Sequence, residues 1–370
     1  MSAELPLASP DFDAAEAEAL LRVLHSRRWS VGPALLDFEQ AMAELAGRRH
    51  GIGVNSGTMA LQIALEALRI GPGDEVIVPA YTFVGPVNAI LAAGAAPVLV
   101  DVDPTTLNID PASVADAIGP RTRAIMPVHL FGRPAAMQPL QALASTHDLR
   151  LIEDACEAAG AADAQGPVGR HGDFACFAFY PNKSVAAGEG GMLVTDDAEL
   201  ALRARQLRNQ GLDPLSGKAI DDHPGHSARL SEWHAAIGQV QLQRLPSALR
   251  QREAIAALYR ARLSADPRFE LLAPAEAGQR LAWFTWPLRL APELHHRRDA
   301  LIQSLRAAGI GCNTYFTPVH QLPYHRGRHR QVALPVSEDI GRRCLAVPLH
   351  GQMGAAEVDR VCEALDRLLP

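Results

Sequence analysis

The chain of 370 residues is long enough to bury a large core, and one large plus one smaller domain is the natural expectation. Its 48% apolar and 21% charged residues are the proportions of an ordinary globular protein. A formal net charge of −6 excludes the basic excess typical of nucleic-acid-binding proteins, so an anionic substrate would have to be met by local positive groups.

Three features of the sequence favour a cytoplasmic protein. The N-terminal residues 1–10 lack a basic region followed by an apolar run, so we expect no secretory signal. The most apolar segment, residues 90–100, is too short to span a membrane and is interrupted by Gly94 and Pro97. The five cysteines are scattered without a Cys-x-x-Cys pair, which favours a reduced protein over a disulfide framework or a zinc site, and no metal is expected.

Short apolar runs alternate with amphipathic stretches through the first 245 residues. This alternation predicts an α/β fold in which a mostly parallel, seven-stranded sheet is covered by helices on both faces. Ligands of such sheets bind at the carboxyl ends of the strands, so the residues that follow each strand are the candidates for chemistry. The predicted strands are residues 51–55, 75–79, 96–101, 124–128, 150–153, 175–179 and 191–195, and predicted helices include residues 58–68, 83–93 and 137–146.

The remainder of the chain predicts a smaller C-terminal α+β domain over residues 246–370, after a large domain with an N-terminal arm over residues 1–245. Strand and helix patterns recur there at lower density. Residues 316–334, rich in His, Arg and Pro, have the composition of a loop and are a candidate lid or substrate wall. The elements predicted here are a long connecting helix over residues 230–263, a strand over 283–290, and helices over 297–308 and 355–369.

The first candidate site is the turn Ser56-Gly57-Thr58 between a strand and a helix. Gly57 permits close approach of a ligand to the backbone, and Thr58 can cap the helix and offer a hydroxyl group. The free N–H groups of a first helical turn form a phosphate site. Because Ser-Gly-Thr is also a common capping sequence, the turn taken alone favours the capping interpretation.

The second candidate is an apolar strand that ends in two acids, Glu153 and Asp154. A carboxylate at the carboxyl edge of a strand can point into the ligand crevice, where it would keep a pyridine nitrogen protonated. The alternative is a solvated strand end or a helix cap, and the motif taken alone favours that alternative.

Lys183 is the third candidate, because it follows another apolar strand and precedes the glycine-rich turn 188–191. Partial burial between strand ends would favour the neutral amine that a Schiff base requires. Most lysines lie instead in solvated surface turns. Lys183 and Lys218 are, however, the only lysines in a chain rich in arginine, and arginine could not serve as a deprotonated amine.

The order of these elements makes the pattern specific: a Gly-Thr turn, an aspartate at a strand end, a lysine and a glycine-rich turn. In this order the sequence resembles the DegT/StrS family of pyridoxal-phosphate (PLP) sugar aminotransferases, which have the fold of type I PLP enzymes. The matching segments are collinear over almost the whole chain: VGP at 31–33, FE at 38–39, NSGT at 55–58, GPGDEVIVP at 71–79, TF at 82–83, PVHLFG at 127–132, EDA at 153–155, FYPNK at 179–183, GEGG at 188–191, RNQG at 208–211, RLSE at 229–232 and PVH at 318–320.

The resemblance implies that Lys183 forms the Schiff base with PLP and shuttles a proton between the amino donor and the cofactor. It further implies that Asp154 pairs with the pyridine nitrogen and that Phe83 stacks on the cofactor ring. Without the family, Phe83 would be interpreted as a core residue at the start of a helix. Gly57 and Thr58 would bind the phosphate.

Three positions depart from the usual pattern of the family. Ala178 stands where many members carry a serine that donates to the phosphate, and Ser227 stands where many carry an asparagine that reaches the phosphate of the neighbouring subunit. Glu157 stands where Gln or His is common, and an ionised acid there would repel the cofactor phenolate. Phosphate binding is therefore expected to rest on the helix start and on four polar side chains: Ser56, Thr58, Tyr180 and Asn182.

The resemblance also supplies substrate contacts and an assembly. Arg229 resembles an arginine supplied across a dimer interface, where its fork would bind the α-carboxylate of glutamate, the usual amino donor of the family. The alternative for Arg229 is an interface ion pair at a helix start. Tyr315 and His320 resemble residues that line the sugar site, and the implied assembly is a homodimer with shared active sites.

The predicted activity is PLP-dependent transamination of a nucleotide-linked 3- or 4-keto deoxysugar, in amino-sugar, O-antigen or antibiotic-sugar biosynthesis. The sugar dehydratases of the family replace the Schiff-base lysine by histidine, so Lys183 argues against that branch. The alternative from another class is a non-catalytic, PLP-binding regulatory protein of the same fold, which Ala178 and Ser227 favour. No nucleic-acid or membrane partner is expected.

Overall fold

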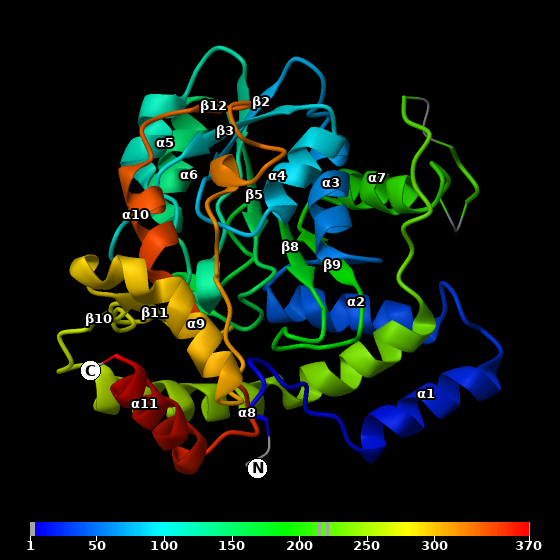
Figure 1. Cartoon of the computed structure of the whole chain (residues 1–370). Helices are drawn as coiled ribbons and strands as arrows, with labels where there is room; N and C mark the ends of the chain where they lie inside the picture. The colour runs from blue at the N-terminus through cyan, green and yellow to red at the C-terminus, as the bar shows by residue number, and fades with distance from the viewer. Residues whose placement is uncertain (1–3, 214–215, 220–221, 370) are drawn as a thin grey trace.

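An eight-stranded sheet with the order β1-β9-β8-β5-β4-β2-β3-β12 is the largest element of the fold (Figure 1). The computed structural model describes residues 4–213, 216–219 and 222–369. The strands of the sheet are β1 (His50–Val54), β2 (Glu75–Pro79), β3 (Ala96–Val100), β4 (Thr122–Ile125), β5 (Arg150–Asp154), β8 (Phe174–Ala178), β9 (Gly191–Thr195) and β12 (Arg330–Gln331).

The predicted α/β fold with a mostly parallel sheet is confirmed. Neighbouring strands from β8 through β5, β4, β2 and β3 to β12 pair in parallel, whereas β9 pairs antiparallel with both β1 and β8. The sheet has one strand more than the seven predicted, because β12 lies within the segment predicted to be a loop. Arg330 of β12 forms an ion pair of 3.0 Å with the buried Glu75 at the start of β2, which fixes this short strand at the sheet edge.

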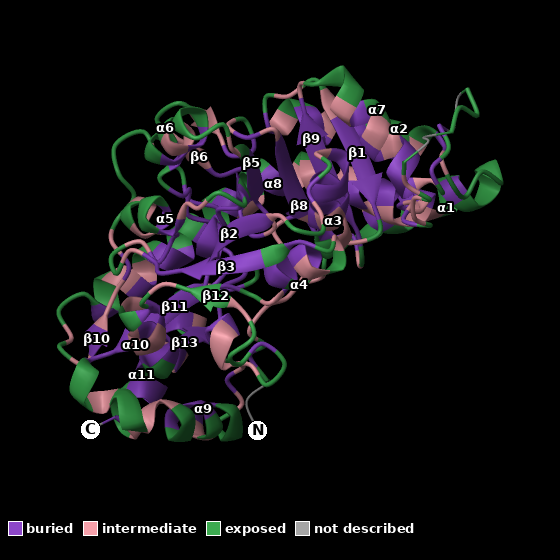
Figure 2. Cartoon of the chain, turned by 90° about the horizontal axis from the view of Figure 1, so that it is seen from above, coloured by how far each residue is buried: buried purple, intermediate pink, exposed green. Residues whose placement is uncertain are grey.

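Successive side chains of the strands point to opposite faces, and different helices cover each face. Val76 and Val78 belong to one buried apolar cluster with α3, α4 and α7, whereas Ile77 belongs to another with α5 and α6. Most strand residues are accordingly drawn as buried in Figure 2. The helices are α3 (Gly57–Ala67), α4 (Gly85–Ala92), α5 (Pro111–Ala117), α6 (Met137–Thr146) and α7 (Ala198–Arg208).

The C-terminal part packs around a three-stranded antiparallel sheet with the order β10-β11-β13. Its apolar cluster is built from this sheet and from residues of α8, α9 and α11. The elements of this part are β10 (Phe269–Glu270), β11 (Trp286–Leu290), β13 (Cys344–Val347), α9 (Arg298–Ala307), α10 (Pro335–Arg343), α11 (Ala355–Leu368) and the 3-10 helices η2 (Pro292–Arg297) and η3 (Val319–Gln321). The 3-10 helix η1 (Leu130–Gly132) and a hairpin of β6 (Ala162–Asp163) and β7 (Gly166–Pro167) lie earlier in the chain, between β4 and β8.

The long predicted helix is α8 (Glu232–Leu263), which runs below the sheet in Figure 1. It contacts α1 (Ala14–Ser26) and α2 (Pro33–Leu45) near its start and α11 further along. The domain boundary predicted between residues 245 and 246 falls inside this helix, beside Pro246, and stays a prediction. In the described part of the chain, no helix combines the length and the apolarity needed to cross a bilayer.

Glu232, the first residue of α8, joins α8 to the start of α2. Its carboxylate accepts hydrogen bonds from the backbone N–H groups of Gly32 (2.8 Å), Ala34 (2.9 Å) and Leu35 (3.0 Å). These amides begin α2, whose N-cap Gly32 offers no side chain of its own. Gly32 is required there because a Cβ atom would lie 2.6 Å from Glu232 Oε2.

We therefore expect Gly32→Ala to destabilise the fold. The added methyl group would displace the Glu232 carboxylate and leave buried amides unpaired, at a cost of about 1–3 kcal/mol. Urea unfolding followed by circular dichroism measures this loss. Gly119→Ala is the matched control, since its Cβ would meet no atom closer than 3.5 Å. Equal midpoints for the two variants would contradict the assigned role of Glu232.

Candidate active site

A cavity of about 410 Å³ lies at the carboxyl ends of the parallel strands. Because these ends meet at one edge of the sheet, residues that are far apart in the chain come together there. The C-terminal part closes the cavity with three aromatic side chains. The wall includes Ser56, Gly57, Thr58, Thr82, Phe83, Val128, Asp154, Cys156, Glu157, Ala178, Tyr180, Asn182, Lys183, Glu189, Gly190, Phe284, Tyr315 and Phe316.

Lys183 is held in the cavity by a tight turn after β8. Its backbone N–H donates to the carbonyl oxygen of Tyr180 at 2.9 Å, and its side chain is 15% exposed. The Nζ atom lies 3.7 Å from Glu157 Oε1 and 4.1 Å from the centroid of the Phe284 ring. The amine therefore has a carboxyl group on one side and an aromatic face on another, and it is neither solvated nor fully enclosed.

Asp154 is buried at the end of β5, in the wall of the same cavity. Its Oδ1 accepts the backbone N–H of Cys156 at 3.0 Å. Burial raises the pKa of Asp154, although hydrogen bonds from Cys156 and the positive charge of Lys183 act in the opposite direction. A cationic ligand group beside this carboxyl would favour its ionised form and would be bound by it.

Glu157 is the second buried carboxyl group in the wall. Its Oε2 accepts the backbone N–H of Phe131 at 2.9 Å. Burial raises the pKa of Glu157, against the lowering effects of Lys183 and the Phe131 amide. A carboxyl with a raised pKa takes up a proton more readily, so the predicted repulsion of a phenolate is weaker than for a solvated acid.

Glu153 points away from the cavity into the protein interior, where it is fully buried. Its Oε2 accepts hydrogen bonds from His129 Nε2 (3.0 Å) and the backbone N–H of Gly169 (3.0 Å). Its Oε1 accepts from the backbone N–H groups of His171 (2.7 Å) and Gly172 (2.9 Å). One carboxylate thus joins the end of β5 to two loops.

The hydrogen bonds of His129 fix its tautomer. Its Nδ1 accepts the backbone N–H of Ala135 at 3.0 Å, so the ring proton lies on Nε2 and is donated to Glu153. Burial acts to raise the pKa of Glu153, but the hydrogen bond from His129, the positive potential of His129 and His171, and the backbone N–H of Gly172 outweigh it and lower the pKa to about 2. Glu153 is therefore a structural carboxylate, and the alternative of a solvated strand end does not apply to it.

The turn after β1 brings backbone close to the cavity, as the sequence suggested. The N-cap of α3 is Ser56, whose Oγ accepts the N–H of Met59 at 3.1 Å, so the prediction that Thr58 caps the helix is wrong. Ser56 has the extended backbone of an N-cap, whereas Thr58 already lies within the helix. A Cβ atom on Gly57 would lie 2.7 Å from Ala178 Cβ, so only glycine fits there.

An aromatic wall closes the cavity on the C-terminal side. Phe83 is 57% exposed, which excludes the interpretation as a core residue, and its ring centroid lies 6.1 Å from that of Phe316. Tyr81 fixes this wall, since its hydroxyl accepts the N–H of Phe316 at 3.0 Å and donates to the carbonyl oxygen of Tyr315. Sequence reasoning missed Phe284 and Phe316, because no local pattern distinguishes an aromatic that lines a cavity from one in the core.

Three of the predicted site residues lie outside this wall. The Arg229 guanidinium donates to Asn209 Oδ1 (3.0 Å) and to Ser227 Oγ (3.2 Å). Ser227 itself is exposed. His320 Nε2 lies 3.2 Å from Glu338 Oε1. The structure therefore brings eight of the eleven predicted site residues together in one chain: Ser56, Gly57, Thr58, Phe83, Asp154, Glu157, Lys183 and Tyr315.

A larger hollow of about 470 Å³ lies between α8 and residues 275–281. Its wall is mainly aliphatic, and its acid Glu253 accepts a hydrogen bond from Trp283 Nε1. The wall contains no amine or thiol. We therefore place the chemistry in the smaller cavity at the strand ends, where titratable groups converge.

Comparisons with known proteins cover nearly the whole chain. Residues 10–366 match the model of the DegT/DnrJ/EryC1/StrS aminotransferase family. The chain is 39% identical over 368 residues to the GDP-perosamine synthase of Caulobacter vibrioides, covering 99% of this chain and 98% of that protein. DesV of S. venezuelae, solved with a ketimine intermediate, matches with a TM-score of 0.92, 37% identity and complete coverage of both chains. DesI, solved in the presence of its TDP-sugar product, matches with a TM-score of 0.91 and 34% identity, covering 99% of this chain and 93% of that one.

The Glu153 network predicts a stability loss for Glu153→Gln. An amide has one acceptor oxygen, so its NH₂ group would face N–H donors, at a cost of about 1–3 kcal/mol. The pKa of Glu153 is lowered in the folded state from 4.5 to about 2, so its stabilising effect is complete above pH 4.5 and is lost as the pH falls towards 2. The difference in unfolding free energy between wild type and variant should therefore narrow across this interval.

Urea unfolding of both proteins, in steps from neutral pH downwards, measures this difference. The exposed Glu363→Gln is the control, with no expected change at any pH. If the difference in unfolding free energy between wild type and Glu153→Gln stays constant down to the lowest pH at which both proteins fold, Glu153 does not have the assigned negative charge.

Proposed function

We propose that this chain, which belongs to the DegT/DnrJ/EryC1/StrS aminotransferase family, transfers an amino group from glutamate to a keto sugar carried on a nucleotide. The observation that carries the proposal is the position of Lys183, whose Nζ lies 3.7 Å from Glu157 in the cavity that also holds Asp154. An amine that can form a Schiff base and a buried carboxyl group that can pair with a pyridine nitrogen, both in one cavity at the strand ends, are the groups that this chemistry requires.

Aminotransferases of this family are PLP-dependent, and the residues of the cavity fit this cofactor. The start of α3 suits a phosphate, because Ser56, Gly57 and Thr58 line the cavity and the first amide groups of a helix have no partner within it. Asn182 Oδ1 is buried and has no hydrogen-bond partner among the described residues, so the wall offers a polar atom to a ligand. When bound, PLP supplies a carbonyl carbon that condenses with amines and a ring that withdraws electrons.

The proposed contacts of the cofactor follow from the wall. Ser56, Gly57 and Thr58 would hold the phosphate, and Asp154 would bind the ring nitrogen. Phe83 would cover one face of the ring. Glu157 would lie beside the ring, and Ser227 would contribute to the phosphate from a second subunit, because it lies outside the cavity of its own chain.

Lys183 is proposed to move the proton. Its Nζ would take the proton from the α-carbon of the donor and return it to the carbon of the cofactor that carries the amino group, on the same face. Glu157, at 3.7 Å, would hold the amine in position between these steps. Asp154 would keep the ring nitrogen protonated, because a buried carboxylate gains most from a cation placed directly beside it.

We further propose that two copies of the chain share their active sites. Arg229 lies beside Asn209 and Ser227, away from the cavity of its own chain, so its fork would bind the donor carboxylate in the partner's cavity. Large apolar side chains are exposed on the adjoining N-terminal elements, which a second copy would cover. They are Leu21, Leu24, Trp29 and Leu36, and the Trp29 ring packs on Trp233 close to Arg229.

The sugar is proposed to bind along the aromatic wall. Tyr315 lines the cavity, whereas His320 is bonded to Glu338 and would act by positioning the segment that carries Tyr315 and Phe316. Since one relative is a GDP-perosamine synthase and another was solved with a TDP-sugar product, we propose a nucleoside-diphosphate sugar with a 3- or 4-keto carbon. All five cysteines are free, which supports a reducing compartment, and we propose the cytoplasm.

The test of the function has two halves. Adding glutamate alone to the PLP-loaded protein should change the cofactor absorption, and adding keto sugars on GDP or TDP should then give one aminated product. Lys183→Arg keeps the positive charge but cannot act as a neutral amine, so turnover should fall by at least roughly 10²–10⁴-fold. Borohydride reduction should leave no covalent cofactor on this variant. A cofactor spectrum that no amino donor changes would instead indicate a non-catalytic PLP-binding protein.

The shared site predicts complementation between inactive variants. Mixed dimers of Lys183→Arg and Arg229→Ala would contain one site with both native residues, so activity should exceed the sum of the two variants alone. Mixtures of Lys183→Arg with Asp154→Asn are the matched control and should show no recovery, because both residues lie in the cavity of one chain. Recovery in neither mixture would place Arg229 in the cavity of its own chain.

A further inference from the structure

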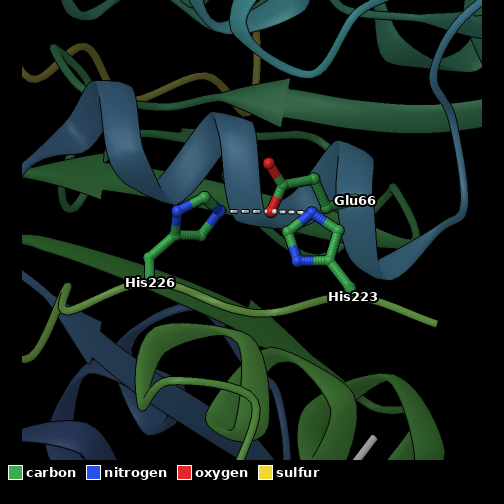
Figure 3. Close-up of side chains that lie close together, drawn as sticks. All are labelled: Glu66, His223 and His226. Carbon is green, nitrogen blue, oxygen red and sulfur yellow. Dashed lines mark hydrogen bonds and ion pairs between the residues drawn. The ribbon is translucent and has the colours of Figure 1, made fainter. Parts of the chain in front are cut away.

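Away from the cavity, three potential metal-ligating side chains converge on one point (Figure 3). Glu66 lies on α3, and His223 and His226 lie on the segment that leads to Ser227. Both imidazole rings point at the Glu66 carboxylate. Among the residues that the structure describes, this is the one group of three such side chains close enough to share an ion. We propose that Glu66, His223 and His226 bind one divalent transition-metal ion, with Zn²⁺ as the best match.

The distances between the ligand atoms suit a metal. Glu66 Oε2 lies 2.7 Å from His226 Nε2 and 3.7 Å from His223 Nε2, and the three atoms are all within 4.8 Å of one another. Zinc bonds to N and O of roughly 2.0–2.2 Å place tetrahedral ligand atoms roughly 3.3 Å apart. The observed separations lie on both sides of that value, so the site needs small side-chain shifts and no change of fold.

The chemistry of the ligands favours Zn²⁺ over Mg²⁺ or Ca²⁺. Two imidazoles and one carboxylate form the His₂Glu set that zinc accepts, whereas the two hard cations require oxygen ligands. The side chain of Glu66 is 7% exposed and those of His223 and His226 are 28% and 25% exposed. A fourth position for water is therefore available on the histidine side of the ion.

A second layer of hydrogen bonds orients the carboxylate. Gln62 Nε2 donates to Glu66 Oε1 at 2.9 Å, which directs Oε2 to the two rings. Such outer contacts are typical of metal sites, where they hold the ligands in position. Gln62 lies one turn before Glu66 on α3, so this arrangement is fixed within a single helix.

Two hydrogen bonds have to be exchanged when the metal binds, and one of them is the bond between His226 Nε2 and Glu66 Oε2. The backbone N–H of Gly225 donates to His223 Nδ1 at 2.9 Å, so in the metal-free state the ring proton of His223 lies on Nε2. Coordination through Nε2 moves that proton to Nδ1 and breaks the bond to Gly225. The proton of His226 moves from Nε2 to Nδ1 in the same way, so neither ring loses a proton, and the adjustment is confined to Glu66 and residues 223–226.

The ion would link residues 223–226, which precede the proposed partner contact Ser227, to α3, which begins in the cavity wall. His226 immediately precedes Ser227, and α3 begins at Gly57. In the metal-free state the segment is tied to α3 by the hydrogen bond between His226 and Glu66. Metal coordination replaces this single bond by three, so the role of the ion is structural and independent of the proposed transamination.

The test uses the PLP-loaded protein without an affinity tag, after treatment with a chelator. Calorimetric titration should show one Zn²⁺ per chain, and Co²⁺ should give the visible absorption bands of a nitrogen- and oxygen-ligated site. In His226→Gln the side-chain amide can still donate to Glu66 but is a poor ligand. The affinity of this variant for Zn²⁺ should therefore fall by more than roughly 10–100-fold, which is the loss expected when only a residue that orients a ligand is removed.

Two controls make the result specific. His223→Gln should weaken Zn²⁺ binding like His226→Gln, and both positions are partly exposed, so the variants are expected to fold. The double variant His295→Gln, His296→Gln removes an exposed histidine pair elsewhere and should bind Zn²⁺ like the wild type. Absence of stoichiometric Zn²⁺ binding, unchanged affinity in His226→Gln, or loss of binding in the 295/296 variant would each overturn the proposal.

Discussion

The buried carboxylate of Glu153 is the constraint on which the geometry of the cavity depends. Its four hydrogen bonds tie the end of β5 to His129 and to the backbone of residues 169–172. Successive residues of a strand face opposite ways. Fixing Glu153 towards the interior therefore directs the neighbouring Asp154 towards the cavity. A structural acid thus orients the adjacent acid that we propose as a cofactor ligand.

Three buried carboxyl groups within five residues differ in the direction in which their surroundings shift the pKa. Glu153 is surrounded by N–H donors, and the pKa of its carboxyl group falls to about 2 despite complete burial. Asp154 and Glu157 have few donors, and burial raises the pKa of each. The difference lies in the hydrogen bonds to the charged form and in the positive potential of His129 and His171 beside Glu153. Asp154 and Glu157, whose charged forms have few hydrogen-bond donors, both lie in the cavity with Lys183. A bound cationic group would therefore change the pKa of these two carboxyl groups.

The sequence predicted the elements whose signals are local. The bounds of β2, β9 and α6 agree with the predictions because apolar runs and breakers mark both ends of each element. It did not predict β12, whose two residues are held by the distant Glu75 rather than by a strand pattern. Nor did it predict Phe284 and Phe316 in the cavity, since their role arises only when the C-terminal part meets the strand ends. The Glu66, His223 and His226 cluster was missed for the same reason, because its members are separated by most of the large sheet in sequence.

The two lysines of the chain show what the structure adds to an argument from residue use. A chain that uses arginine almost everywhere is expected to retain lysine where a neutral amine is needed. Lys218 is exposed on a surface segment, so rarity alone would assign it the same role. Lys183 differs because its side chain is 15% exposed, with a carboxyl group and an aromatic ring within contact distance of Nζ. The scarcity of lysine in the sequence draws attention to both residues equally. Only the surroundings of Nζ distinguish a lysine in a cavity from a lysine on the solvated surface.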